Sequence, residues 1–215
     1  MPRAILFDLD GTLLDTLDDL TDSMNRVLSR RGLPQHDRDA YKYFVGDGAP
    51  ILVQRVLPEG HRDEVTVQAI LTDFRAEYAL HWRVKTHPYD GAVEMLEELS
   101  RRKLVLAVLS NKPHEATVRC VEGLLPARLF SVVAGLGEGR APKPDPVGAL
   151  EIARRLDIDP ADFLYLGDTS VDMRTAVAAG MLPVGVLWGF RSAEELRSSG
   201  ARHLLRNPGD VLGLL

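Results

Sequence analysis

The sequence predicts an α/β fold, in which a doubly wound, mainly parallel sheet carries an inserted all-helical domain. Short apolar runs that fit strands buried on both faces alternate with helical patterns along most of the chain. Such an alternation is typical of βαβ units, which build parallel sheets. One long stretch near the N-terminus breaks the alternation and carries helical patterns without a good strand. That stretch predicts the inserted domain.

The first strand of the core is expected at residues 4–7, where four apolar residues stop at Asp8. Similar apolar runs predict four further strands, at 104–109, 132–134, 163–166 and 184–187. Helical patterns separate most of these strands, at 92–102, 115–124, 146–156 and 171–179. Signals for helix ends agree with this assignment: Pro113 and Pro146 suit a first turn, Asp145 suits an N-cap and Gly180 suits a C-cap.

The interrupting stretch covers residues 15–85, with helical patterns at 17–30, 51–57 and 65–82. Segments that contain glycine and proline separate these patterns. We therefore expect a catalytic core made of residues 1–14 and 86–215, and a helical cap domain inserted at 15–85. A chain of 215 residues is long enough for a core domain that carries a smaller one.

Composition and charge narrow the classes of function. A hydrophobic content of 45% and a charged content of 27% are ordinary for a globular protein in water. The net charge of -5 disfavours nucleic acid as a partner, because binding its backbone requires a basic stripe. Cys120 is the single cysteine, so no intrachain disulfide can form and a reducing compartment is expected. No apolar stretch is long enough for a signal peptide or a membrane span. We expect a cytoplasmic protein with no membrane partner.

Chemically informative side chains follow the predicted strands. Because ligands bind at the carboxyl ends of the strands in open α/β sheets, residues distant in sequence should converge there. The residues in these positions are Asp8, Asp10, Ser110, Asn111, Lys143, Asp168 and Asp172.

The aspartates among them predict a metal site. Asp8, Asp10 and Asp168 would bring three carboxylates together, and Asp172 follows about one helical turn later. Like charges this close repel one another unless a cation lies between them. Ligands that are all oxygen suit a hard cation such as Mg²⁺, which also accepts water and phosphate oxygens.

The same residues predict covalent phosphate chemistry. An aspartate such as Asp8 can act as a nucleophile and form an acyl-phosphate. Asp10, two residues later, could protonate the leaving group and then take a proton from the water that hydrolyses the intermediate. Lys143 and the Ser110 hydroxyl could offset the charge of the phosphate.

Together these residues resemble the motifs of the haloacid dehalogenase-like hydrolases over nearly the whole chain. The four motifs are matched, in order, by Asp8-Leu9-Asp10-Gly11-Thr12, Ser110-Asn111, Lys143 and Gly167-Asp168-Thr169-Ser170-Val171-Asp172. The helical insertion after the first motif is similar to the C1 cap of this family. The resemblance implies a Rossmann-like core under a helical cap.

The resemblance also implies a role for each matched residue. Asp8 is the nucleophile and Asp10 the general acid and base. Asp8, the backbone carbonyl of Asp10 and Asp168 bind Mg²⁺, and Asp172 supports the metal site indirectly. Ser110, Asn111 and Lys143 belong to the site that holds the phosphoryl group.

Further segments resemble the phosphoglycolate phosphatase group of the family, which makes 2-phosphoglycolate the leading candidate among small phosphorylated metabolites. Within the cap, the segment Phe44-Val45-Gly46-Asp47-Gly48 carries this resemblance. Caps of related enzymes read the part of the substrate beyond the phosphate. Gly46, Asp47 and Gly48, with Arg55 or Lys42 nearby to meet a carboxylate, are therefore candidate substrate residues.

Three other functions stay open on the sequence alone. A phosphomutase of the β-phosphoglucomutase type uses the same aspartyl-phosphate, and inorganic pyrophosphate is another substrate for a phosphatase. A phospho-accepting signalling module is the alternative without enzymatic turnover, although in receiver domains the phosphorylated aspartate follows the third strand. The sequence does not distinguish a monomer from a homodimer.

Overall fold

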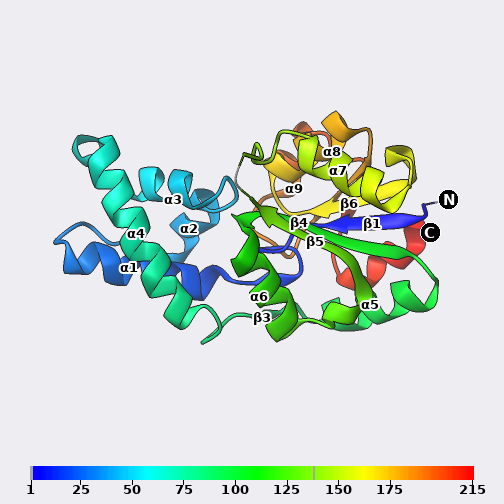
Figure 1. Cartoon of the computed structure of the whole chain (residues 1–215), viewed down its shortest axis with the longest axis horizontal. Helices are drawn as coiled ribbons and strands as arrows, with labels where there is room; N and C mark the ends of the chain where they lie inside the picture. The colour runs from blue at the N-terminus through cyan, green and yellow to red at the C-terminus, as the bar shows by residue number, and fades with distance from the viewer. Residues whose placement is uncertain (1, 138) are drawn as a thin grey trace. The chain divides into compact units, whose positions relative to one another are not determined.

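The computed structural model describes residues 2–137 and 139–215 of the chain. These residues divide into two compact units, one formed by residues 2–14, 88–137 and 139–215 and the other by Asp15–His87. We call them the core unit and the helical unit (Figure 1).

A six-stranded sheet forms the centre of the core unit, and each registered pair of neighbouring strands is parallel. Its order is β5-β4-β1-β6-β7-β8, so the N-terminal strand lies inside the sheet. The strands are β1 (Ala4–Phe7), β4 (Val105–Pro113), β5 (Phe130–Leu136), β6 (Phe163–Gly167), β7 (Leu182–Val186) and β8 (His203–Leu205). The doubly wound α/β fold predicted from the sequence is confirmed.

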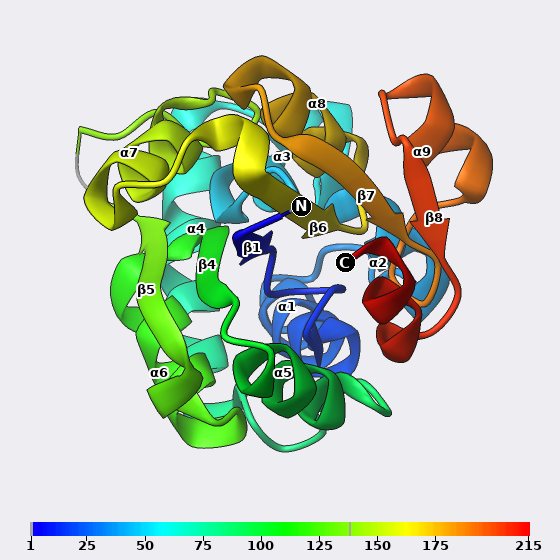
Figure 2. The same cartoon turned by 90° about the vertical axis from the view of Figure 1, so that its right-hand side faces the viewer.

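Helices cover both faces of this sheet (Figure 2). On one face lie α5 (Ala92–Arg101) and α6 (His114–Leu124), and on the other lie α7 (Val147–Leu156) and α8 (Ser170–Ala179). The helix α9 (Ala193–Ser198) packs beside β7, and the C-terminal 3-10 helix η4 (Pro208–Leu214) packs against α5. Shorter 3-10 turns are η2 (Ala127–Leu129) and η3 (Pro160–Asp162).

Burial explains why the strands are continuous apolar runs. All four residues of β1 are fully buried, because the strand has a neighbour on each side and helices above and below. Each large apolar side chain buried in this way contributes about 1.5–3 kcal/mol. The chain then has to emerge at the carboxyl end of β1, where the polar residues begin.

Four helices make up the helical unit: α1 (Leu17–Arg30), α2 (Arg38–Phe44), α3 (Ala49–Val56) and α4 (Glu64–His81), with the 3-10 turn η1 (Glu59–His61). Helix α1 packs along α4 (Figure 1). Aspartate side chains cap two of the helices: Asp37 accepts a hydrogen bond from Ala40 N at 2.8 Å and Asp63 one from Thr66 N at 2.9 Å. The two connecting segments contain short strands, β2 (Leu14–Asp15) and β3 (His87–Pro88), which pair with each other.

The structure differs from the sequence-based expectations at several elements, among them the short strands β2 and β3, which were not expected. Helix α2 and strand β8 were not expected, and β4 runs on to Pro113 instead of ending at residue 109. Ser110 and Asn111 therefore lie within the last residues of a strand and not in the loop that leaves it. Within the described part of the chain, no helix is both long enough and apolar enough to cross a membrane.

Candidate active site

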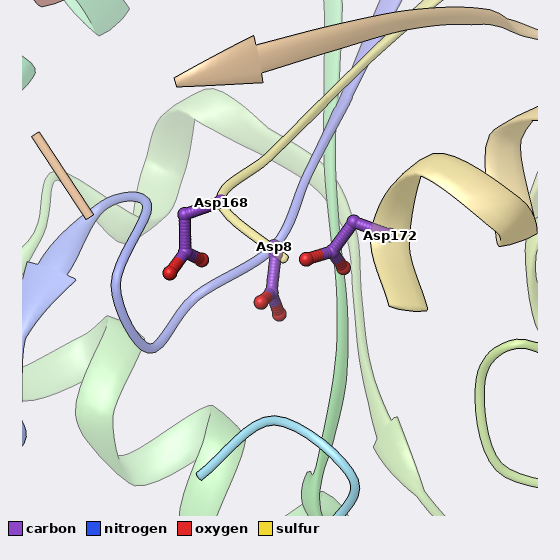
Figure 3. A group of neighbouring side chains, drawn as sticks. All are labelled: Asp8, Asp168 and Asp172. Atoms are coloured by element: carbon purple, nitrogen blue, oxygen red, sulfur yellow. The ribbon is translucent and has the colours of Figure 1, made fainter. Parts of the chain in front are cut away.

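Three buried carboxylates meet at the carboxyl ends of two central strands. Asp8 follows β1, Asp168 follows β6 and Asp172 lies in the first turn of α8. Each offers an oxygen that lies within 4.8 Å of the oxygens of the other two (Figure 3). The backbone fixes this position, since Asp8 N donates to Leu166 O at 2.9 Å and so continues the pairing of β1 with β6.

Lys143 is the cation that faces this group. Its Nζ lies 2.8 Å from Asp8 Oδ1 and 2.7 Å from Asp172 Oδ1, and it also donates to the carbonyl of Leu109 at 3.2 Å. Its side chain is 4% exposed. One ammonium thus bridges two carboxylates.

The side chain of Asn111 holds the backbone of Lys143. Its Oδ1 accepts from Lys143 N at 2.8 Å, and its Nδ2 donates to Lys143 O at 3.1 Å. Lys143 lies in the loop between β5 and α7, so the hydrogen bonds of a helix or strand do not position its backbone. Asn111, at the end of β4, therefore links that loop to the sheet.

Asp168 is held by one contact on each of its carboxylate oxygens. Thr12 Oγ1 donates to Oδ1 at 3.0 Å, and the backbone N–H of Phe190 donates to Oδ2 at 2.9 Å. Gly11 approaches so closely, at φ +88°, that a Cβ at this position would overlap the carboxylate. A glycine is required there both for the turn and for the contact.

Asp172 has a structural role at the start of α8. Its Oδ2 accepts from Thr169 N at 3.1 Å and from Thr169 Oγ1 at 2.6 Å, while Thr169 caps the helix in return. This reciprocal arrangement is a capping box. With Oδ1 bound to Lys143, both oxygens of Asp172 have protein donors, which fits an indirect support of a metal site.

The charges of the site are unbalanced. Burial, together with the charges of Asp172 and Asp168, raises the pKa of Asp8 well above its usual range, although Lys143 opposes this. Burial and the charge of Asp172 raise the pKa of Asp168 to about 7. Burial lowers the pKa of Lys143, but the carboxylates of Asp172 and Asp8 outweigh it and hold that pKa well above its usual value.

The donor set fits a hard divalent cation. Three carboxylates face one ammonium, so negative charge remains uncompensated in a buried place. A cation bound by Asp8 and Asp168 would offset the negative charge that, together with burial, raises the pKa of both carboxyl groups. Oxygen ligands from short carboxylates suit Mg²⁺.

Asp10 does not join the three carboxylates. Instead Lys112 Nζ contacts both of its oxygens, at 3.0 and 3.2 Å. The nearby Ser110 side chain is buried, and its Oγ accepts from Lys112 N at 3.2 Å. The structure thus contains two separate lysine–aspartate contacts, one between Lys112 and Asp10 and the other between Lys143 and Asp8.

The candidate substrate residues of the helical unit form one local structure. Gly46 (φ +124°) and Gly48 (φ +90°) both have positive φ angles in the turn between α2 and α3. Arg55 reaches back to this turn, with Nη2 2.6 Å from Asp47 Oδ2 and Nη1 donating to the carbonyls of Tyr43 and Phe44. Arg55 therefore already has a carboxylate partner, Asp47.

Several residues of the site were not singled out from the sequence. Lys112, Thr12, Thr169 and the backbone of Phe190 all contact the predicted aspartates. For Thr169 a signal existed, because a threonine followed three residues later by an acidic residue at a helix start predicts a capping box. The contact from Phe190 is made by the main chain and leaves no signal in residue type.

Comparisons with known proteins agree with this fold. The family model described as haloacid dehalogenase-like hydrolase matches residues 5–186. Phosphoglycolate phosphatase of Rhodospirillum rubrum is 35% identical over 94% of this chain and 86% of its own length. Phosphoglycolate phosphatase 1 of Pseudomonas aeruginosa is 30% identical over 99% of this chain and 79% of its own.

Among solved structures, a Lactobacillus delbrueckii subsp. bulgaricus protein with a provisional phosphoglycolate phosphatase name superimposes with a TM-score of 0.93. It is 30% identical, and the match covers 98% of this chain and 97% of that one. The chain thus combines an α/β fold with a group of buried aspartates at the carboxyl ends of its strands. The chain belongs to the haloacid dehalogenase-like hydrolases, and within them it is similar to the phosphoglycolate phosphatases.

Proposed function

We propose that this protein is a Mg²⁺-dependent phosphatase that hydrolyses a small phosphate monoester through an aspartyl-phosphate on Asp8. The observation that carries the proposal is the buried group of Asp8, Asp168 and Asp172 with the Lys143 ammonium against it. A nucleophilic carboxylate, a cation site and a fixed positive charge are the three parts that phosphoryl transfer through aspartate requires.

In the first step an oxygen of Asp8 attacks phosphorus, and the bond between phosphorus and the ester oxygen breaks. Asp10 gives its proton to the departing oxygen. In the second step water attacks the phosphorus of the aspartyl-phosphate and passes a proton to Asp10. The bond between phosphorus and Asp8 then breaks, which releases inorganic phosphate and restores both carboxyl groups.

Three residues hold the phosphoryl group in this proposal. Lys143 offsets its charge, and the Ser110 hydroxyl donates to one of its oxygens. Asn111 contributes by fixing the Lys143 backbone through its two hydrogen bonds. Because one ammonium lies against two carboxylates before substrate arrives, its position is set in advance.

Asp8, Asp168 and the backbone carbonyl of Asp10 would hold Mg²⁺, and Asp172 supports them through Lys143. When bound, the ion supplies positive charge that offsets the phosphate and the carboxylates. The contacts to Asp168 from Thr12 and from Phe190 N fix the direction of its carboxylate.

The substrate we propose first is 2-phosphoglycolate, because relatives that match most of this chain carry the name phosphoglycolate phosphatase. We propose that the turn with Gly46, Asp47 and Gly48, braced by Arg55, contacts the end of the substrate beyond the phosphate.

The test is a panel of small phosphates assayed with wild type and Asp8→Asn, each with Mg²⁺ and with EDTA. The panel contains 2-phosphoglycolate, pyrophosphate and a sugar 1-phosphate. We expect phosphate release from 2-phosphoglycolate with the highest kcat/KM, and none with Asp8→Asn or with EDTA. If wild type hydrolyses no member faster than Asp8→Asn, the phosphatase proposal is wrong.

The same panel separates the alternatives. A sugar 6-phosphate that forms faster than free phosphate would indicate a phosphomutase. A phosphorylated protein that persists without turnover would indicate a signalling module. Pyrophosphate as the best substrate would keep the chemistry and change the substrate.

A further inference from the structure

The contact between Lys112 and Asp10 is the strongest feature that the proposed chemistry does not yet use. Lys112 Nζ lies 3.0 Å from one oxygen of Asp10 and 3.2 Å from the other. The side chains are 7% and 15% exposed. The pair of Lys85 with Asp22, outside the site, is far more open, with side chains that are 52% and 37% exposed.

The main chain of Lys112 is fixed on both sides, which sets where its side chain begins. Its N–H donates to Ser110 Oγ at 3.2 Å, and its carbonyl accepts from Thr117 Oγ1 in α6 at 3.2 Å. Lys112 also lies in the last residues of β4, whose neighbour in the sheet is β1. The ammonium therefore approaches Asp10 from a rigid element.

A cation that contacts both oxygens fixes the rotation of a carboxylate. It also keeps Asp10 apart from the other carboxylates, because the charge of Asp10 already has a partner. The outcome is visible in the geometry: Asp8, Asp168 and Asp172 form one group, and Asp10 lies outside it on Lys112.

We propose that Lys112 is a positioning residue for Asp10, which it holds in the orientation that proton transfer requires. This inference rests on the proposed function and adds a residue to it. Lys112 acts through Asp10 in both steps. Asp10 gives a proton to the departing ester oxygen in the first step and takes one from the attacking water in the second. Bond making and breaking at phosphorus stay with Asp8.

The experiment compares wild type, Lys112→Met and Lys112→Arg on two substrates in Mg²⁺. One is p-nitrophenyl phosphate, whose leaving group departs without a proton, and the other is 2-phosphoglycolate, whose alkoxide needs one. For Lys112→Met we expect kcat for 2-phosphoglycolate to fall about 10- to 100-fold with little change in KM, a part of what a positioned acid and base contributes. Lys112→Arg should recover part of that loss.

The aryl substrate gives a second readout. With Lys112→Met the aspartyl-phosphate should form at nearly the wild-type rate and hydrolyse slowly. We therefore expect a burst of nitrophenol of about one equivalent per protein, and phosphorylated protein in acid-quenched samples by mass spectrometry. A residue with a merely structural role would not produce this burst.

Two further variants serve as controls. Lys85→Met removes a lysine–aspartate contact of similar length, 2.8 Å, outside the site, and should leave kcat and the burst unchanged. In an Asp10→Asn background, adding Lys112→Met should change kcat by about threefold or less, since residues that act through one another are not additive. The double variant also removes both charges, so it does not leave a buried charge unpaired.

Each outcome decides between the hypotheses. A rise in KM for 2-phosphoglycolate with unchanged kcat and no burst would mean that Lys112 binds substrate, and would overturn the inference. Unchanged kinetics of Lys112→Met in an active wild type would overturn it as well. A wild type no more active than Asp8→Asn would instead contradict the proposed function itself.

Discussion

Lys143 Nζ lies 2.8 Å from Asp8 Oδ1, and both side chains are at least nine-tenths buried. The same ammonium also faces Asp172, whose side chain is fully buried. The pair is a large local concentration of buried charge, and in the proposed function it is also the place where phosphoryl transfer occurs. Removing the lysine should lower the stability of the folded protein, whereas removing the Asp8 charge should maintain or raise it.

Removing the cation should destabilise the protein. Lys143→Met leaves Asp8 and Asp172 buried without their partner, and breaking a buried ion pair from one side costs about 3–5 kcal/mol. Urea unfolding in EDTA measures this loss. Lys85→Met, which breaks an exposed pair, should cost about 0–1 kcal/mol. Equal losses for the two variants would show that the buried charges are not coupled as the geometry indicates.

Removing the carboxylate should abolish activity without harming the fold. Asp8→Asn takes one negative charge from a place where burial and two neighbouring carboxylates already raise the pKa of Asp8. We expect phosphate release to fall at least about 1,000-fold, because the covalent route is lost. Thermal unfolding in EDTA at neutral pH should occur at the wild-type temperature or above it. Asp162→Asn, at a partly exposed acid before β6, is the control and should stay active.

The raised pKa of Asp168 predicts a pH dependence of stability in the metal-free protein. That pKa is about 7 in the folded state, against about 3.9 for an unfolded aspartate. Between these values the folded protein binds a proton that the unfolded chain does not, so its stability should fall as pH rises from about 4 to about 7. The difference in unfolding free energy between wild type and Asp168→Asn, measured in EDTA across this range, isolates the effect. A difference that stays flat with pH would contradict it.

Gly11 should be intolerant of any side chain. In Gly11→Ala the added Cβ would overlap the Asp168 carboxylate, so the aspartate must move from its contacts with Thr12 and Phe190 N. We expect weaker Mg²⁺ binding by calorimetry and at least about a tenfold loss of kcat/KM. Gly180→Ala is a matched control, because Gly180 has a similar φ of +73° and open space around its Cβ position. It should cost about 1 kcal/mol of stability and little activity.

The buried parts of the fold could be predicted most closely from the sequence. Strand β1 begins and ends where its apolar run does, because burial on both faces leaves no room for a polar residue within it. Helix α2 has only seven residues and buries only Tyr41, so its apolar pattern is too short to recognise. Strand β8 has three residues, of which only Leu205 is buried.

The site was predictable to the level of residue type and not of pairing. Lys143 and four aspartates near strand ends predict charge contacts, but the partner of each aspartate depends on the sheet order, and Lys112 was not singled out. Asp10 and Lys112 are 102 positions apart and meet because β4 lies beside β1. Asn111 was expected at the phosphate, and in the structure its side-chain amide holds the Lys143 backbone, which anchors that loop to the sheet.

The two chain ends of the helical insertion are joined by hydrogen bonds, which has a consequence for the evolution of such proteins. Within the helical unit, the buried Asp19 carboxylate near the start of α1 accepts from the N–H groups of Lys85 and Thr86 at its other end. Within the core unit, Tyr89 N donates to Leu13 O, which joins the residues that flank the insertion in the sequence. Each unit thus brings its own two chain ends together, so exchanging one insertion for another adds little loop-closure entropy. A lineage could acquire new substrates by replacing this module while its aspartates stay untouched.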